Sequence, residues 1–145
     1  MYSVGNLIAL VTAMAVARIL VVDDDNEILT LTCQMLILHG YEVLRATDSC
    51  QALEAVNKNP IDLIVSDNQM PGMQGTDLIR EIKQFSPQTA CVLMTGSAIK
   101  SENVPDGVPV LTKPFSIQVL TSTVEAALAA ASLIGAVYPD GFGEP

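Results

Sequence analysis

The sequence predicts an α/β protein built on a doubly wound, five-stranded parallel sheet with helices on both faces. Short apolar runs rich in β-branched residues alternate with helical stretches about five times along the chain. Strands that alternate with helices in this way are joined by right-handed crossovers, which makes the strands parallel and covers both faces of the sheet. The 145 residues, half of them hydrophobic, suffice for one domain with a sizeable core.

Five apolar runs are typical of buried strands and lie at residues 18–22, 41–46, 61–66, 90–94 and 108–111. Pro109 in the last run indicates a strand at the edge of the sheet, because proline donates no ladder hydrogen bond.

Helices are predicted between and after these strands. The first begins at Asp25 or Asn26 and ends at Gly40, and its apolar residues at helical spacing are Ile28, Leu31, Met35 and Leu38. The others are expected at residues 48–58, 75–85, 98–107 and 116–133. Pro105 and Gly107 leave room for only about two turns in the fourth helix, which is therefore predicted to be shortened.

The two ends of the chain differ from this repeating pattern. Residues 1–17 contain no charged side chain and are expected to form an apolar N-terminal extension, helical or disordered. A signal peptide would need a basic segment that is missing here, and 17 residues are short for a membrane span. Residues 18–133 are expected to form the domain, followed by a flexible tail at 134–145.

Charge and cysteine content limit the classes of partner. Sixteen acidic against seven basic residues give a net charge of −9, which disfavours nucleic acid and anionic lipid as direct partners. Cys33, Cys50 and Cys91 show no metal-ligand spacing and are predicted to be buried free thiols in a reducing cytoplasm. His39 is the only histidine, which makes a zinc site improbable.

Polar side chains follow four of the predicted strands. Asp23 and Asp24 follow the first, Asp67 the third, Thr95 the fourth and Lys113 the fifth. Taken singly, each has a structural explanation, such as a helix cap, a turn cap or a surface charge. The carboxyl ends of parallel strands lie at one edge of the sheet, however, so these groups are predicted to converge there.

The chemistry of such a cluster follows from its charges. Three neighbouring carboxylates repel one another and attract a cation, and ligands that are all oxygen atoms favour Mg²⁺ or Mn²⁺. Lys113 would direct a positive charge toward an incoming phosphoryl group, and the Thr95 hydroxyl could donate to one of its oxygens. In that setting Asp67 is predicted to be a carboxylate nucleophile for phosphoryl transfer.

Four motifs carry a resemblance to a known family: ILVVDDD at 19–25, VSDNQMPGMQG at 65–75, LMTGS at 93–97 and LTKPF at 111–115. This set resembles the receiver domain of bacterial two-component response regulators, similar to CheY. The resemblance implies the flavodoxin-like strand order 2-1-3-4-5 and a cytoplasmic single-domain signalling protein rather than an enzyme. It also implies phosphate transfer from a histidine kinase or histidine phosphotransfer protein, with output through contacts to a downstream protein.

The resemblance also implies a role for each site residue. Asp67 is the expected phosphoacceptor, Lys113 the lysine that contacts the phosphoryl group and Thr95 the switch hydroxyl. The expected ligands of Mg²⁺ are the acidic pair Asp23 and Asp24, together with Asp67 and the backbone carbonyl of Gln69.

Two departures from the family pattern affect the expected output. Val110 stands where the family usually has an aromatic residue that moves on activation, and Asn68 replaces the usual apolar residue after the phosphoacceptor. Together with the shortened fourth helix, Val110 motivates an alternative, a receiver-like binding module that acts without phosphorylation. A haloacid-dehalogenase-like phosphatase is disfavoured, because no acidic pair follows Lys113.

Overall fold

The computed structural model describes residues 16–137, with side chains to residue 132. Almost all of the expected N-terminal extension, and residues 138–145 of the expected tail, lie outside the described residues.

The core of the fold is a five-stranded sheet in the order β2-β1-β3-β4-β5, with every pair of neighbours parallel. Its strands are β1 (Arg18–Val22), β2 (Glu42–Ala46), β3 (Leu63–Asp67), β4 (Ala90–Thr95) and β5 (Val110–Thr112). This arrangement confirms the predicted fold class and strand order. β5 lies at the edge of the sheet, as predicted. It begins at Val110 rather than at residue 108, however, so Pro109 precedes the strand instead of lying in it.

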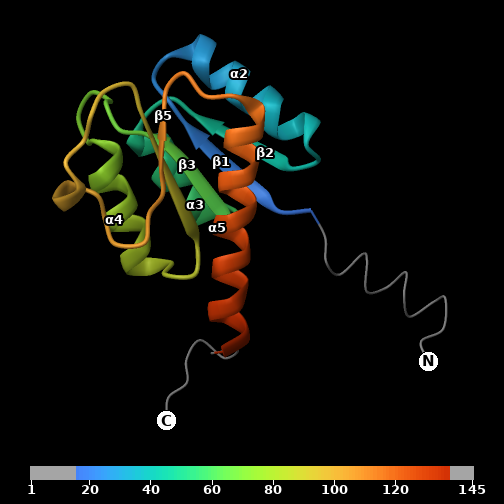
Figure 1. The fold of residues 1–145 in the computed structure, drawn as a ribbon. Coiled ribbons are helices and arrows are strands. Elements are labelled where there is room, and N and C mark those ends of the chain that lie inside the picture. The colour runs from blue at the N-terminus through green and yellow to red at the C-terminus, as the bar shows by residue number, and fades with distance from the viewer. Residues whose placement is uncertain (1–15, 138–145) are drawn as a thin grey trace, which may run out of the picture.

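Helices cover both faces of the sheet (Figure 1). They are α2 (Asn26–Leu38), α3 (Ser49–Lys58), α4 (Gly75–Phe85) and α5 (Ile117–Val137). Alternate residues of the strands point to opposite faces, so the sheet divides the core into two clusters. Leu20 and Ile64 pack with α3 and α4, whereas Ile19 and Val65 pack with α2 and α5.

The buried face of α2 is not the stripe of residues whose spacing predicted the helix. Its buried residues are Leu29, Thr32, Cys33 and Leu36. Leu31 and Leu38 are 53% and 82% exposed. The helix is apolar around most of its circumference, with Glu27 as its one charged residue, so spacing alone does not fix which side faces the sheet.

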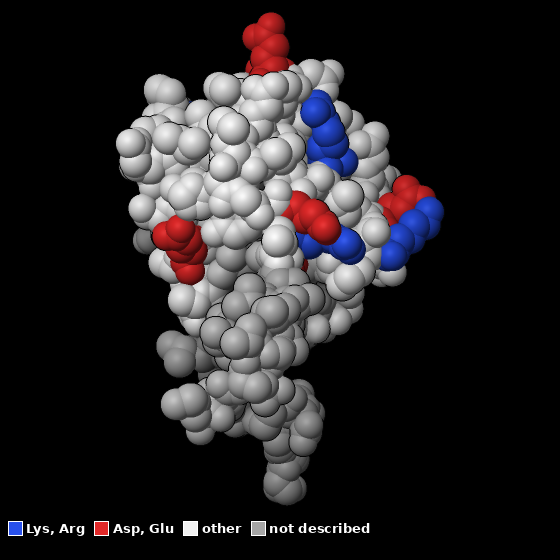
Figure 2. Space-filling model, turned by 90° about the vertical axis from the view of Figure 1, so that its right-hand side faces the viewer, with Lys and Arg blue, Asp and Glu red and all other residues white. Residues whose placement is uncertain are grey.

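The surface reflects this low charge content. On the face shown in Figure 2, charged side chains form small separate groups, and the basic ones do not gather into a stripe. None of the helices in the described part of the chain has the length and apolar character needed to span a membrane.

The connection between β4 and β5 departs furthest from a regular βα unit. Two helical turns were expected within residues 98–107, but only a single 3-10 turn forms, η1 (Ser101–Asn103). The predicted helix was too long, because the backbone is extended at Lys100 and Val104, on either side of η1. The segment surrounds a hollow of about 710 Å³ lined by Thr95, Ile99 and Val110, among others.

Two smaller expectations also need correction. α5 continues to Val137, four residues beyond its predicted end at residue 133, because nothing in the sequence ASLIGAV interrupts a helix strongly. Cys33 and Cys91 are buried free thiols as predicted, but Cys50 is exposed. Burial raises the pKa of the Cys91 thiol to about 11, so it is protonated and unreactive at neutral pH.

Candidate metal and phosphoryl-transfer site

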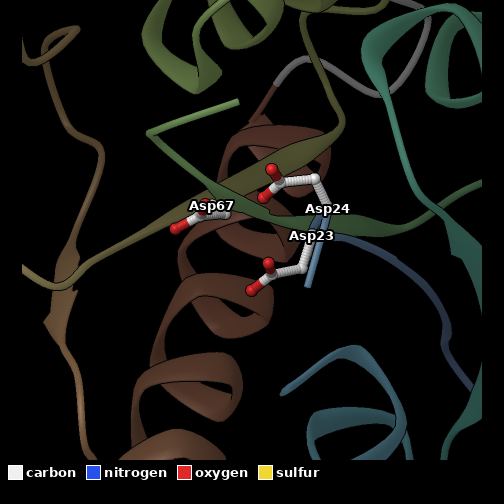
Figure 3. Close-up of side chains that lie close together, drawn as sticks. All are labelled: Asp23, Asp24 and Asp67. Carbon is white, nitrogen blue, oxygen red and sulfur yellow. The ribbon is translucent and has the colours of Figure 1, made fainter. Parts of the chain in front are cut away.

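The parallel register brings the predicted site residues to one edge of the sheet. Val22 lies opposite Ser66, so the residues that follow them, Asp23 and Asp67, extend from neighbouring strands. On the other side Asp67 lies opposite Met94, one residue before Thr95. Figure 3 shows the carboxyl groups of Asp23, Asp24 and Asp67 close together, two from the end of β1 and one from the end of β3.

Lys113 joins the two buried carboxylates. Its Nζ atom donates to Asp23 Oδ2 and to Asp67 Oδ1, each at 2.9 Å. The side chains of Asp23 and Asp67 are 1% and 7% exposed, and that of Lys113 is 17% exposed. Lys113 is therefore not a free surface charge, and the oxygen Asp67 Oδ1 faces a cation rather than capping the turn that follows it.

The three consecutive acids after β1 have different surroundings. Asp25 is the N-cap of α2, and its Oδ1 accepts hydrogen bonds from the backbone N–H groups of Glu27 and Ile28. Asp23 is buried, and its Oδ1 accepts from the backbone N–H of Asp25 while Oδ2 faces Lys113. Asp24 is exposed at the mouth of the site. The helix-cap explanation therefore holds for Asp25 and not for the other two.

The three carboxylates fit a small divalent cation. One oxygen from each of Asp23, Asp24 and Asp67 lies within 4.8 Å of the others. Oxygens on opposite sides of an octahedral Mg²⁺ lie about 4 Å apart, so only a small contraction would bring the three groups into coordination. With one ammonium against three carboxylates, these four groups carry a formal charge of −2, which favours a divalent cation.

The titration of the buried pair reflects this excess of negative charge. Burial raises the pKa of the Asp67 carboxyl above its ordinary 3.8, and the nearby charge of Asp23 adds to the effect, while the hydrogen bond from Lys113 opposes it. Burial works against the charge of Lys113, but its hydrogen bonds to Asp67 and Asp23 prevail and raise its pKa. Asp67 is thus a destabilised carboxylate beside a firmly protonated lysine.

Thr95 and Gln69 lie beside this centre with their side chains engaged locally. Thr95 is 2% exposed. Its hydroxyl donates to the backbone oxygen of Ser97 at 2.8 Å and accepts a hydrogen bond from the Ser97 N–H. The Lys113 N–H donates to the Thr95 carbonyl at 2.8 Å, which ties the ends of β4 and β5 together. Gln69 is exposed, and its side-chain amide donates to the Ser97 hydroxyl at 3.1 Å.

Sequence reasoning missed the structural roles of two residues, Gly75 and Asn68, that shape the loop after Asp67. A Cβ atom at Gly75 would lie 2.2 Å from the backbone oxygen of Asp67, so only glycine allows α4 to begin this close to β3. The Asn68 side chain accepts a hydrogen bond from the Thr76 N–H in the first turn of α4. A glycine at the first position of a predicted helix, where it is a poor helix former, was the available signal for Gly75.

A parallel α/β sheet with acids, a hydroxyl and a lysine at its carboxyl edge is typical of proteins that bind a ligand at that edge. The family model of the response regulator receiver domain matches residues 19–125. The chain therefore belongs to the response regulator receiver domain family.

Individual relatives agree with this assignment. The chain is 40% identical over 114 residues to the uncharacterized transcriptional regulatory protein YrkP of Bacillus subtilis, with 77% of this chain and 49% of YrkP covered. It is 31% identical over 118 residues to the response regulator receiver protein CpdR of Brucella abortus, with 79% of this chain and 98% of CpdR covered. It thus spans about half the length of YrkP and nearly all of CpdR.

Solved structures give the same answer. A CheY-like receiver domain protein from Methanospirillum hungatei is similar with a TM-score of 0.76 and 28% identity, over 83% of this chain and all of that one. A receiver domain protein from Clostridium thermocellum matches with a TM-score of 0.74 and 33% identity, over 82% of this chain and 99% of that one. Receiver domains are signalling domains of two-component systems that interact with histidine kinases and downstream targets.

Proposed function

We propose that this receiver domain accepts a phosphoryl group on Asp67 from a phosphohistidine of a histidine kinase or histidine phosphotransfer protein, and that the reaction depends on Mg²⁺. The observation that carries the proposal is the position of Lys113 Nζ, 2.9 Å from both Asp67 and Asp23. That lysine compensates the buried acids in the resting protein and lies within reach of a group transferred to Asp67.

The reaction would exchange one bond to phosphorus for another. A carboxylate oxygen of Asp67 forms a P–O bond as the P–N bond of the phosphohistidine breaks. The departing imidazole nitrogen keeps the electron pair and is neutral or takes up a proton. Asp67 Oδ1 accepts from Lys113, whereas Oδ2 has no hydrogen-bond partner among the described residues and is the oxygen available for attack.

The metal would be held by Asp23, Asp24, Asp67 and the backbone carbonyl of Gln69. When bound, Mg²⁺ supplies positive charge that stabilises the oxygens of the transferred group. The exposed position of Asp24 gives the cation a route from solvent, and the buried Asp23 keeps its hydrogen bond with Lys113 as a fixed counter-charge.

The Thr95 hydroxyl would exchange its hydrogen bond to the Ser97 carbonyl for one to a phosphoryl oxygen. In this chain that exchange has no buried aromatic to follow it, because the side chain at the expected position is Val110, which is 38% exposed. The signal would instead pass to the irregular segment between β4 and β5 and from there to a protein partner.

The test is to incubate the protein with Mg²⁺ and a small phosphodonor such as acetyl phosphate and to measure the intact mass. We expect a base-labile gain of about 80 Da, one phosphoryl group, that is absent in Asp67→Asn and in samples treated with a chelator. A wild-type protein that never gains this mass, although it folds and binds Mg²⁺, would favour the phosphorylation-independent binding module instead.

A further inference from the structure

The side chain that follows Asp67 makes a contact that the proposed chemistry does not use. Asn68 is buried, with only 9% of its surface exposed, and its Oδ1 accepts a hydrogen bond from the Thr76 N–H at 3.2 Å. A buried amide in place of an apolar side chain is costly to desolvate unless it is used for hydrogen bonding. Here it takes the place of a helix cap, because Gln74, the N-cap residue of α4, makes no side-chain cap hydrogen bond.

The backbone of Asn68 is fixed on both sides as well. Its N–H donates to the Met94 carbonyl of β4 at 2.9 Å, and its carbonyl accepts from the Gly75 N–H at 3.0 Å. The loop from Asn68 to Gly75 is therefore closed by two hydrogen bonds to α4, one from the backbone and one from the side chain. Gly75 adds a steric constraint, because its missing Cβ lets α4 approach the Asp67 carbonyl.

We infer that Asn68 is a positioning residue for the metal site, which it serves by holding the Gln69 backbone in place. This inference rests on the proposed function, in which the Gln69 carbonyl is a ligand. Gln69 follows Asn68 in the chain. Among the described residues of this loop, it is the first whose backbone makes no hydrogen bond to another backbone group. Its position therefore depends on Asn68 before it and on the contact of its side chain with Ser97.

The test compares Mg²⁺ affinity, measured by titration calorimetry, in the wild type and in Asn68→Leu, which keeps the size of the side chain and removes the acceptor. We expect Asn68→Leu to bind Mg²⁺ about fivefold more weakly, the effect of losing one neutral hydrogen bond. Amide exchange of Thr76 and Gly75 should become faster in the same variant. If Asn68→Leu does not fold, Asn68→Ala is measured with the same expectation.

Two further variants separate positioning from a merely structural role. Asn68→Asp retains the acceptor, so Thr76 exchange should stay slow and Mg²⁺ should bind at least as tightly as in the wild type. Ile82→Val lowers stability from the buried face of α4 without touching the loop, and should leave Mg²⁺ affinity unchanged.

The outcomes distinguish this inference from the function on which it rests. If the wild type fails to bind Mg²⁺, the proposed metal site itself is wrong. If the wild type binds but Asn68→Leu binds equally well, or Asn68→Asp loses as much affinity as Asn68→Leu, the positioning role of Asn68 is overturned. Equal weakening in Ile82→Val would overturn it too, since affinity would then follow overall stability.

Discussion

Replacing the proposed phosphoacceptor should make the protein more stable. In Asp67→Asn the amide oxygen can still accept the hydrogen bond from Lys113, which the carboxylate now accepts at 2.9 Å. What the variant removes is one of two almost fully buried negative charges that share a single lysine. Since the pKa of Asp67 is raised, the folded protein holds this carboxylate at a cost in free energy.

The magnitude follows from the distances. Carboxylate oxygens of Asp67 and the buried Asp23 lie within 4.8 Å of each other. At an effective dielectric of about 20, two negative charges at that distance repel each other by at least about 3.5 kcal/mol. The exposed Asp24 adds about 1 kcal/mol, because water screens it. The attraction of Lys113 at 2.9 Å is about 6 kcal/mol on the same scale. Attraction exceeds repulsion only slightly, and desolvation of the carboxylate costs several kcal/mol more, so we expect a gain of about 1–2 kcal/mol in Asp67→Asn.

The measurement is urea unfolding followed by far-UV circular dichroism at pH 7 in a chelator, since the chain has no Trp. Glu81→Gln is the matched control: it removes one negative charge from an exposed position of α4 and should change stability little. Saturating Mg²⁺ should stabilise the wild type and not Asp67→Asn, so the gap between them should shrink or reverse.

The dependence on pH gives a second check. A raised pKa means that the folded state binds the proton more tightly than the unfolded state does. The stabilisation that comes from protonated Asp67 is therefore complete below the ordinary pKa of 3.8 and is lost as the pH rises through the raised pKa. The advantage of Asp67→Asn should accordingly be full at neutral pH and fade on acidification. An Asp67→Asn protein less stable than the wild type in chelator would refute this account of the site.

Three further predictions concern the neighbours of Asp67. Gly75→Ala should destabilise the protein by about 2 kcal/mol in urea unfolding, because the clash with backbone outweighs the better helix propensity of alanine, whereas Gly96→Ala, with open space around its Cβ, should be nearly neutral. Lys113→Ala should cost about 3 kcal/mol by leaving two buried carboxylates unpaired, and Mg²⁺ should restore part of the loss; equal stability with and without Mg²⁺ would contradict this. Replacing Gln69 or Ser97, whose side chains are joined by a hydrogen bond of 3.1 Å, should change the rate of dephosphorylation, measured by the decay of the phosphorylated mass. An unchanged rate in both variants would argue against a role of this pair in the lifetime of the phosphoryl group.

The sequence predicted the sheet and the convergence of its polar strand ends well, because both depend on local features. An apolar run followed by an acid places Asp23 and Asp67 at the ends of strands, and the parallel topology then places them side by side. The roles assigned to these residues and the metal they would bind stay predictions.

Features that depend on packing could not be read in the same way. The spacing that included Leu31 and Leu38 predicted a helix correctly but not its buried side, because α2 is apolar on several sides and the sheet decides which one it covers. The cap made by Asn68 joins residues eight positions apart through a loop, which no pattern of helix capping describes. The length of the helix before β5 was overestimated, since Pro105 and Gly107 limit a helix without showing whether one forms at all.

The 3-10 turn between β4 and β5 has a consequence for selectivity. A partner that recognises receivers by binding a regular helix between β4 and β5 would meet a loop and a hollow in this protein instead. The chain would then be insulated from targets that recognise related receivers through that helix. In a cell with many such proteins, the absence of a helix that other partners bind can separate one signalling route from another as effectively as a new contact.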